Sequence, residues 1–180
     1  MKMKFFYTLL VATVIAIGIS SCAKKENYPV TPAITFKQHI LYTPGDSLDI
    51  QINFTDGDGD IGYPTGDTAA PYNCYLIYMV DTNNSGNFIT IENSLNVNPK
   101  ATTGDTIAYT YTVPYITPTG SDKALNGIIQ IRLQHGDWRF TYPPVISNVG
   151  KAIKFQIWII DRAGHISNRV LSDPILVPNT

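Results

Sequence analysis

Residues 48–54 read Leu48-Asp49-Ile50-Gln51-Ile52-Asn53-Phe54, an unbroken alternation of apolar and polar side chains. Successive side chains of a β-strand point to opposite faces, so this stretch predicts a strand with one buried and one solvated face. The same period of two recurs along the chain. Clear runs lie at 106–113, 129–134 and 152–159, and weaker runs lie at 34–42, 73–80, 87–91 and 167–177.

These runs predict an all-β protein of about eight short strands, a single antiparallel β-sandwich with the Greek-key order of an immunoglobulin domain. The composition agrees, because 13 Gly and 12 Pro suit a chain with many turns. We expect the sandwich to span residues 33–178, without a second domain or an internal repeat. The apolar faces of the clear runs predict a shared core that includes Ile52, Phe54, Ile131, Phe155 and Ile157.

Charge and motifs argue against several classes of function. Thirteen basic and 14 acidic side chains give a net charge of −1, so no basic surface predicts binding to nucleic acid. The sequence holds none of the patterns of serine hydrolases, zinc proteases or P-loop NTPases. We therefore expect a protein that is not an enzyme. A glycoside-acting enzyme with two facing carboxylates is the less favoured alternative.

The N-terminus carries the features of a targeting signal. Lys2 and Lys4 precede an uncharged apolar stretch at 5–19, which is too short for a comfortable membrane span and fits a secretory signal peptide. The following residues, Ile19-Ser20-Ser21-Cys22, resemble the lipobox of bacterial lipoproteins.

The lipobox resemblance implies that residues 1–21 are removed and that Cys22 is acylated. Several acyl chains hold a protein stably on a bilayer, so the implied location is the outer membrane, facing either the periplasm or the cell surface. An ordinary signal peptide with a chance cysteine is the alternative. Residues 22–32 are polar, contain Pro and lack periodicity, which predicts a flexible tether after the lipidated cysteine.

Cys74 is the other cysteine of the mature chain. With Cys22 acylated, it has no partner for an internal disulfide. It lies within the apolar run at 73–80, which predicts a buried strand residue rather than a nucleophile.

The most acidic segment directly follows the alternating run at 48–54 and reads Asp56-Gly57-Asp58-Gly59-Asp60-Ile61-Gly62. Three neighbouring carboxylates repel one another unless a cation lies among them. Ca²⁺ is the natural candidate, because it takes six to eight oxygen ligands. The spacing matches the first, third and fifth positions of an EF-hand loop, but Ile61 stands where that loop requires Gly.

An immunoglobulin-like order brings a second acidic residue to the same place. In that topology the loops after the second and the penultimate strands lie at one end of the sandwich. Those loops are 56–62 and 161–165, so we expect Asp161 to join Asp56, Asp58 and Asp60 around one structural Ca²⁺. The alternative is a tight turn that Arg162 or Arg169 and water neutralise.

Two segments resemble a known group of proteins. The run at 54–62 and the later Asp161-Arg162-Ala163-Gly164-His165-Ile166-Ser167-Asn168 look like uncharacterised surface-associated lipoproteins of Bacteroidetes with Ig-like or cadherin-like domains. The resemblance implies a β-sandwich lipoprotein without known catalysis and, by analogy with cadherin-like modules, a Ca²⁺ site. His165 stands where the group usually has Asn.

The resulting prediction is a non-catalytic cell-envelope lipoprotein that serves as a structural, adhesive or accessory module. The alternative is a module that binds a glycan or an envelope protein through the aromatic segment at 137–144. In that hypothesis Trp138 and Tyr142 form an exposed platform for sugar rings or a partner. The competing interpretation is that these side chains close one end of the sandwich.

Overall fold

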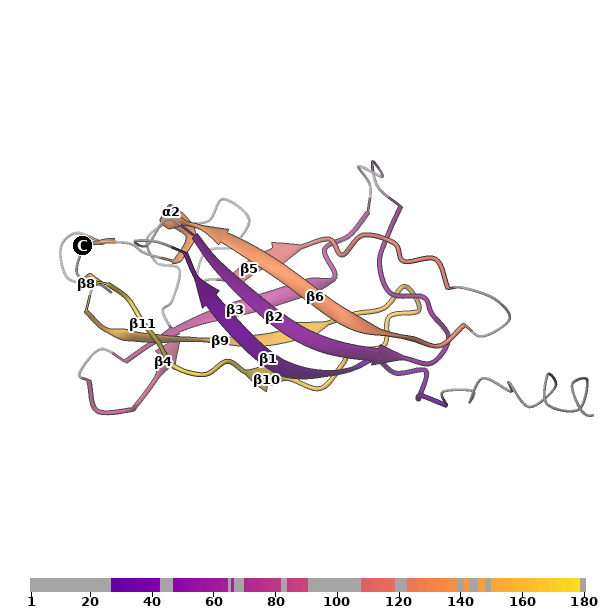
Figure 1. Cartoon of the computed structure of the whole chain (residues 1–180), viewed down its shortest axis with the longest axis horizontal. Coiled ribbons are helices and arrows are strands. Elements are labelled where there is room, and N and C mark those ends of the chain that lie inside the picture. The colour runs from indigo at the N-terminus through magenta and orange to yellow at the C-terminus, as the bar shows by residue number, and fades with distance from the viewer. Residues whose placement is uncertain are drawn as a thin grey trace, which may run out of the picture.

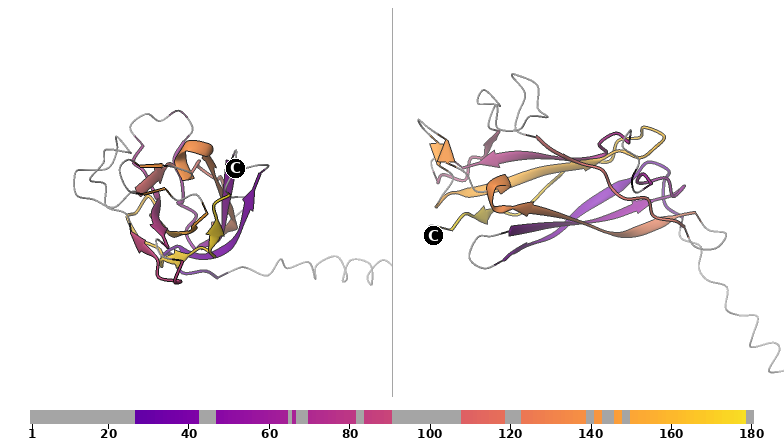
Figure 2. Two further views of the ribbon diagram at one scale, coloured as in Figure 1. Left: turned by 90° about the vertical axis from the view of Figure 1, so that its left-hand side faces the viewer. Right: turned by 90° about the horizontal axis from the view of Figure 1, so that it is seen from above.

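The fold is described from a computed structural model of the 180-residue chain. The structure describes residues 27–42, 47–64, 66, 70–81, 84–90, 108–118, 123–138, 141–142, 146–147 and 150–178. These residues form antiparallel sheets that pack face to face as a β-sandwich, as the alternating runs predict (Figures 1 and 2). In the part described, no helix is both long enough and apolar enough to cross a membrane.

The first sheet has the order β1-β2-β6. Its strands are β1 (Ala33–Leu41), β2 (Ser47–Asp56) and β6 (Leu125–Gln134). The central strand β2 contains the alternating run, and its apolar side chains Leu48, Ile50 and Ile52 are fully buried. Asp49 pairs across the sheet with Arg132, which places a carboxylate and a guanidinium side by side on the outer face.

The second sheet has the order β10-β9-β3-β4, with β11 also paired to β9 and β5 to β3. Its strands are β3 (Cys74–Val80), β4 (Ile89–Thr90), β5 (Ala108–Tyr111), β9 (Ala152–Ile159), β10 (Val170–Leu171) and β11 (Ile175–Leu176). One side of the sandwich therefore holds β1, β2 and β6, and the other holds β3, β9 and β10 with their neighbours β4, β5 and β11. This arrangement corresponds to the A-B-E and G-F-C strands of an immunoglobulin domain.

The expected strand at 167–177 is divided in the structure. Both β10 and β11 pair with the same neighbour, β9, but a break at Ser172–Pro174 separates them. Pro174 has no backbone N–H to donate to the sheet, which accounts for an interruption at this point. Ser172 fills the gap, because its hydroxyl accepts a hydrogen bond from the Phe155 N–H at 3.0 Å.

One hydrophobic core joins the inner faces of both sheets. The five side chains predicted to share it, Ile52, Phe54, Ile131, Phe155 and Ile157, are all buried there, which confirms the face assignment of three runs. Cys74 is also fully buried and forms no disulfide in the described part of the chain. Burial raises the pKa of its thiol to about 12, as expected for a structural cysteine.

A short helix, α2 (His135–Trp138), closes the end of the sandwich where β6 finishes (Figure 1). Beyond it, β7 (Thr141–Tyr142) and β8 (Ile146–Ser147) pair as a separate two-stranded sheet. The Trp138 side chain is fully buried in the common core. This end therefore uses its tryptophan for packing.

Candidate metal centre

Two loops meet at the end of the sandwich opposite α2, and we call this region the Asp end. It consists of the loop at 57–62, which follows β2, and the loop at 161–165, which follows β9. The Arg162 N–H donates to the Asp60 main-chain carbonyl at 3.3 Å, and the Ala163 N–H donates to the Asp60 carboxylate at 3.0 Å. The predicted convergence of these loops is therefore present in the structure.

Asp56, Asp60 and Asp161 come together at the Asp end. Each contributes one carboxylate oxygen to a group in which all three oxygens lie within 4.8 Å of one another. Two ligands on opposite sides of one Ca²⁺ would lie about 5 Å apart, since Ca–O distances are about 2.3–2.6 Å. The spacing therefore suits a single cation of this size. Asp58, the fourth predicted ligand, is not a member of this group of three.

The three carboxylates of the first loop each leave an oxygen unsatisfied. Asp56 accepts the Asp60 N–H through Oδ2 at 2.9 Å, and Asp60 accepts the Ala163 N–H through Oδ2. The Oδ1 atoms of Asp56, Asp58 and Asp60 are buried and have no hydrogen-bond partner. Buried polar atoms are nearly always paired, so three unpaired carboxylate oxygens at 56–60 make this stretch a candidate site for a cation.

Strand parity explains why Asp56 points inward. It continues the core-facing positions of β2, two residues beyond the buried Phe54, and it is fully buried itself. The pKa of the Asp56 carboxyl is raised from 3.8 to about 6. Burial is the main cause, and repulsion from Asp58, Asp60 and Asp161 contributes to the same shift. Burial likewise raises the pKa of Asp60, with Asp161 and Asp58 adding repulsion.

Asp161 is buried and already shapes its own loop. Its Oδ1 accepts the His165 N–H at 2.7 Å, and its Oδ2 lies 2.8 Å from His165 Nδ1. The carboxylate raises the pKa of the His165 imidazole above its usual value. His165 thus orients the Asp161 carboxylate. It lies beside the cluster of Asp56, Asp60 and Asp161 and is not a member of that cluster.

The glycines of the first loop allow two close approaches. Gly59 has a φ of +70°, and a Cβ built on it would lie 2.1 Å from the Lys123 carbonyl oxygen. A Cβ on Gly57 would lie 2.2 Å from the carbonyl oxygen of Tyr28, in the predicted tether. Only glycine fits at both positions, so the Asp-Gly-Asp-Gly-Asp repeat combines carboxylates with tight backbone packing.

Of the two arginines that could neutralise this loop, Arg162 lies beside it and its charge lowers the pKa of Asp60, whereas Arg169 is engaged elsewhere. Arg162 donates from Nε to the Asp60 main-chain carbonyl at 2.9 Å, and its guanidinium lies 4.7 Å from the centre of the Tyr115 ring. Arg169 lies over the Trp158 ring and contacts Gln156. Among the described residues, neither Lys nor Arg forms an ion pair with Asp56, Asp58 or Asp60.

The folded chain buries Trp138 completely, as expected if it closes one end of the sandwich, so Trp138 does not belong to the alternative aromatic platform. The side chain of Tyr142 lies outside what the structure describes. The partly exposed tryptophan is instead Trp158 on the outer face of β9, stacked at 5.1 Å on Tyr75 of β3 and covered by Arg169. The alternation at 152–159 places Trp158 on the polar face, which is the signal that could have identified it.

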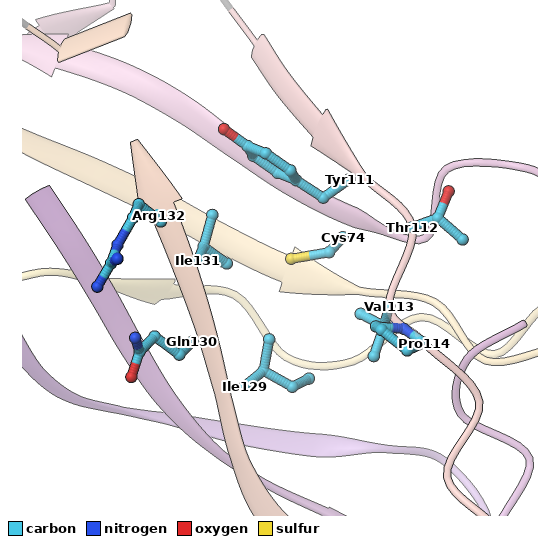
Figure 3. Close-up of a pocket in the computed structure, with 9 residues that line it drawn as sticks. All are labelled: Cys74, Tyr111, Thr112, Val113, Pro114, Ile129, Gln130, Ile131 and Arg132. Atoms are coloured by element: carbon cyan, nitrogen blue, oxygen red, sulfur yellow. The ribbon is translucent and has the colours of Figure 1, made fainter. Parts of the chain in front are cut away.

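A separate cavity of about 190 Å³ opens between β6 and the chain that follows β5 (Figure 3). Its lining is mostly apolar and contains no carboxylate: Cys74, Tyr111, Thr112, Val113, Pro114, Ile129, Gln130, Ile131 and Arg132. The raised pKa of the Cys74 thiol disfavours the thiolate that a nucleophile requires. Among its lining residues the cavity therefore offers neither a carboxylate nor an imidazole for acid–base chemistry.

The comparisons with known proteins assign no family to the chain. No family model and no curated protein matches the chain. One solved structure, OgpA from Akkermansia muciniphila, is similar over 87% of this chain with 10% identity and a TM-score of 0.36. This chain spans 31% of the length of that protein.

Proposed function

We propose that this protein is a non-catalytic lipoprotein of the outer membrane, a structural, adhesive or accessory module whose Asp end is stabilised by Ca²⁺. The observation that carries the metal assignment is the set of three buried, unpaired Oδ1 atoms on Asp56, Asp58 and Asp60. Asp161 is brought to the same place by the second loop. The resemblance to Bacteroidetes lipoproteins with Ig-like domains supports the same proposal.

The donor set favours a hard cation. All the candidate ligands are carboxylate oxygens, which suit Ca²⁺ or Mg²⁺ better than zinc or copper. Ca²⁺ is favoured over Mg²⁺, because Ca²⁺ accepts irregular sets of carboxylate and carbonyl oxygens, whereas Mg²⁺ demands a near-ideal octahedron. In this proposal Ca²⁺ binds Asp56, Asp60 and Asp161, with Asp58 as a further ligand and backbone carbonyls completing the coordination.

Thermal melting tests the metal assignment. The unlipidated chain from residue 22, with Cys22→Ser, is melted in EDTA, in millimolar Ca²⁺ and in Mg²⁺. For a Kd of about 10⁻⁴ M, Ca²⁺ at about 1 mM stabilises the folded state by about 1.4 kcal/mol, and Ca²⁺ at about 10 mM stabilises it by about 2.7 kcal/mol. The gain should disappear in Asp58→Asn and persist in Asp173→Asn, an exposed aspartate away from the loops. A melting temperature that is independent of Ca²⁺ would favour a turn that is stable without metal.

The membrane assignment rests on Cys22, which lies outside the described residues. Cells fed a clickable fatty acid should label the wild type and Cys74→Ser, and should not label Cys22→Ser. The mutant should also leave the membrane fraction. Equal labelling of the wild type and Cys22→Ser would contradict the lipoprotein proposal.

A binding role is the second candidate, and the partly exposed row of Tyr75, Trp158 and Arg169 is the observation that favours it. Tyr, Trp and Arg are the residues most enriched at the energetic centres of interfaces. Capture of an envelope glycan or protein by the wild type, with loss of capture in Trp158→Ala, would support this role. Unchanged capture in Trp158→Ala would exclude this row as the binding surface.

A further inference from the structure

The chain between the proposed lipid anchor and the sandwich is fastened to the Asp end. The Gly57 N–H donates to the Pro29 carbonyl at 2.9 Å, and Asn126 donates to the Tyr28 hydroxyl at 3.2 Å. The absence of a side chain at Gly57 lets the Tyr28 backbone lie directly against the first loop. The last residues of the predicted tether therefore belong to the folded domain and leave it at the Asp end (Figure 1).

The distance from this exit point to the anchor is short. Four residues separate Cys22 from Asn27, where the described chain begins. A fully extended chain covers at most about 3.6 Å per residue, so Asn27 lies within about 18 Å of Cys22. Acylation of Cys22 would thus hold the Asp end next to the bilayer, whatever path the intervening residues take.

The Asp end presents the mixture of side chains that suits a membrane interface. Four apolar or aromatic side chains there are more than a third exposed: Val30, Tyr115, Ile116 and Ile166. The exposed cations Lys123 and Arg162 flank them, with Arg162 stacked on Tyr115. Tyrosine rings and basic side chains with long apolar stems are favoured at the level of the lipid headgroups.

Exposure alone would not select this end, because the opposite end is also apolar at Leu41, Tyr42, Ile89 and Leu176. The position of the tether distinguishes the two ends. The acidic loop would repel an anionic bilayer, but a bound Ca²⁺ and the neighbouring cations offset its charge. The same cation that satisfies the buried carboxylates therefore permits close approach to lipid.

We propose that the Asp end rests on the bilayer surface, as a second membrane contact beside the acyl chains of Cys22. The inference builds on the proposed function, since it requires the lipid anchor and is strengthened by the bound cation. It assigns the opposite end, with α2, and the outer faces of both sheets to the aqueous side, where a partner could reach them.

Spin labels at engineered cysteines test this orientation. The acylated protein is reconstituted with Ca²⁺ into phosphatidylcholine–phosphatidylglycerol vesicles, with a label at Ile166→Cys, Val30→Cys or Leu176→Cys. Acylation protects Cys22 and burial protects Cys74 from labelling. Collisions with oxygen and with a nickel chelate then measure the depth of each label. All three positions are highly exposed, so these substitutions should leave the fold intact.

The labels at 166 and 30 should shift from water to the headgroup region, about 5–10 Å into the interface. The label at 176, a matched apolar position at the opposite end, should stay as accessible to the nickel chelate as in detergent. Full aqueous exposure of all three labels, or shielding of 176 alone, would overturn the proposal. Failure of the protein to remain with the vesicles would refute the anchor, whereas the melting experiment judges the metal independently.

Discussion

Asp49 and Asp56 lie on the same strand, β2, and both are fully buried, yet their surroundings are opposite. Arg132 donates to both oxygens of Asp49, at 2.7 and 2.8 Å, while Tyr42 and Gln130 donate to Oδ2. At the other end of the strand, Asp56 faces three further carboxylates and leaves Oδ1 unpaired.

The pKa shifts of the two aspartates differ because their hydrogen-bond and charge partners differ, although both carboxyls are buried. The Arg132 guanidinium holds the pKa of the Asp49 carboxyl below its usual value, whereas burial raises the pKa of Asp56 to about 6. A buried charge is tolerated when it is paired and hydrogen-bonded, and is costly when it is not. The comparison shows that the chain neutralises Asp49 by itself and leaves Asp56 without a cationic partner among the described residues. In our proposal, Ca²⁺ is that partner.

The largest expected change in the free energy of unfolding is at Asp49, the aspartate that the protein neutralises by itself. Asp49→Asn removes the charge to which three side chains donate, and hydrogen bonds to charged groups contribute about 1.5–3 kcal/mol. We expect the free energy of unfolding to fall by about 2–3 kcal/mol, with or without Ca²⁺. Urea denaturation measures this. A loss that appears only in the presence of Ca²⁺ would place the metal near Asp49 instead.

Asp56→Asn should have the opposite sign in EDTA. At neutral pH the wild type must keep a carboxylate whose pKa is raised to about 6, and the amide removes that cost. We expect a gain of about 1–3 kcal/mol in the absence of metal. The same substitution should abolish stabilisation by Ca²⁺. A large loss of stability in EDTA would show that the ionised Asp56 is satisfied by the protein alone.

The pH dependence separates the two aspartates without mutation. Between 3.8 and about 6, the folded metal-free protein keeps a proton on Asp56 that the unfolded chain releases. The contribution of Asp56 to the free energy of unfolding therefore falls as the pH rises through this window. Asp49 acts in reverse, because its lowered pKa contributes stability that is lost as the pH falls below its ordinary value.

Urea midpoints in EDTA at about pH 5 and about pH 7 should reveal the Asp56 contribution, since both values lie above the ordinary aspartate pKa. We expect the lower midpoint at the higher pH, and a reduced difference in Asp56→Asn. An equal midpoint at both pH values in the wild type would mean that Asp56 is not destabilised in the metal-free fold.

The smallest expected effect is at Arg162. Its side chain is exposed and donates to a main-chain carbonyl rather than to a carboxylate, so Arg162→Gln should cost about 0.5 kcal/mol or less. Thermal melting in EDTA measures the change. A cost comparable to that of Asp49→Asn would restore the alternative in which this arginine neutralises the acidic loop.

Periodicity predicted the fold well because each strand has one buried face. The core positions of β2, β6 and β9 and the meeting of the two loops follow from alternation and topology alone. The pairing of Asp49 with Arg132 could not be predicted, since it depends on the register of strands about 80 residues apart. The burial of Trp138 likewise depends on how α2 turns over the end of the core.

The sequence predicted which aspartates would form the candidate site, but not how their carboxylates are arranged. Alternating aspartates indicated a cation, yet the sequence did not reveal that Asp58 stands apart from the three clustered carboxylates. Nor did it reveal that Tyr28 and Pro29 pack against Gly57, because a polar, Pro-containing segment has no periodicity to show where it docks.

The most direct test of the account is an NMR titration of the metal-free chain with Ca²⁺, following the backbone amides. We predict saturable shifts at Asp60, Ala163 and neighbouring loop residues, with one ion per chain and a Kd of about 10⁻⁴–10⁻³ M. These shifts should vanish in Asp56→Asn and persist in Asp49→Asn. Absence of saturable shifts in the wild type, or their survival in Asp56→Asn, would contradict the claim that the Asp end binds Ca²⁺.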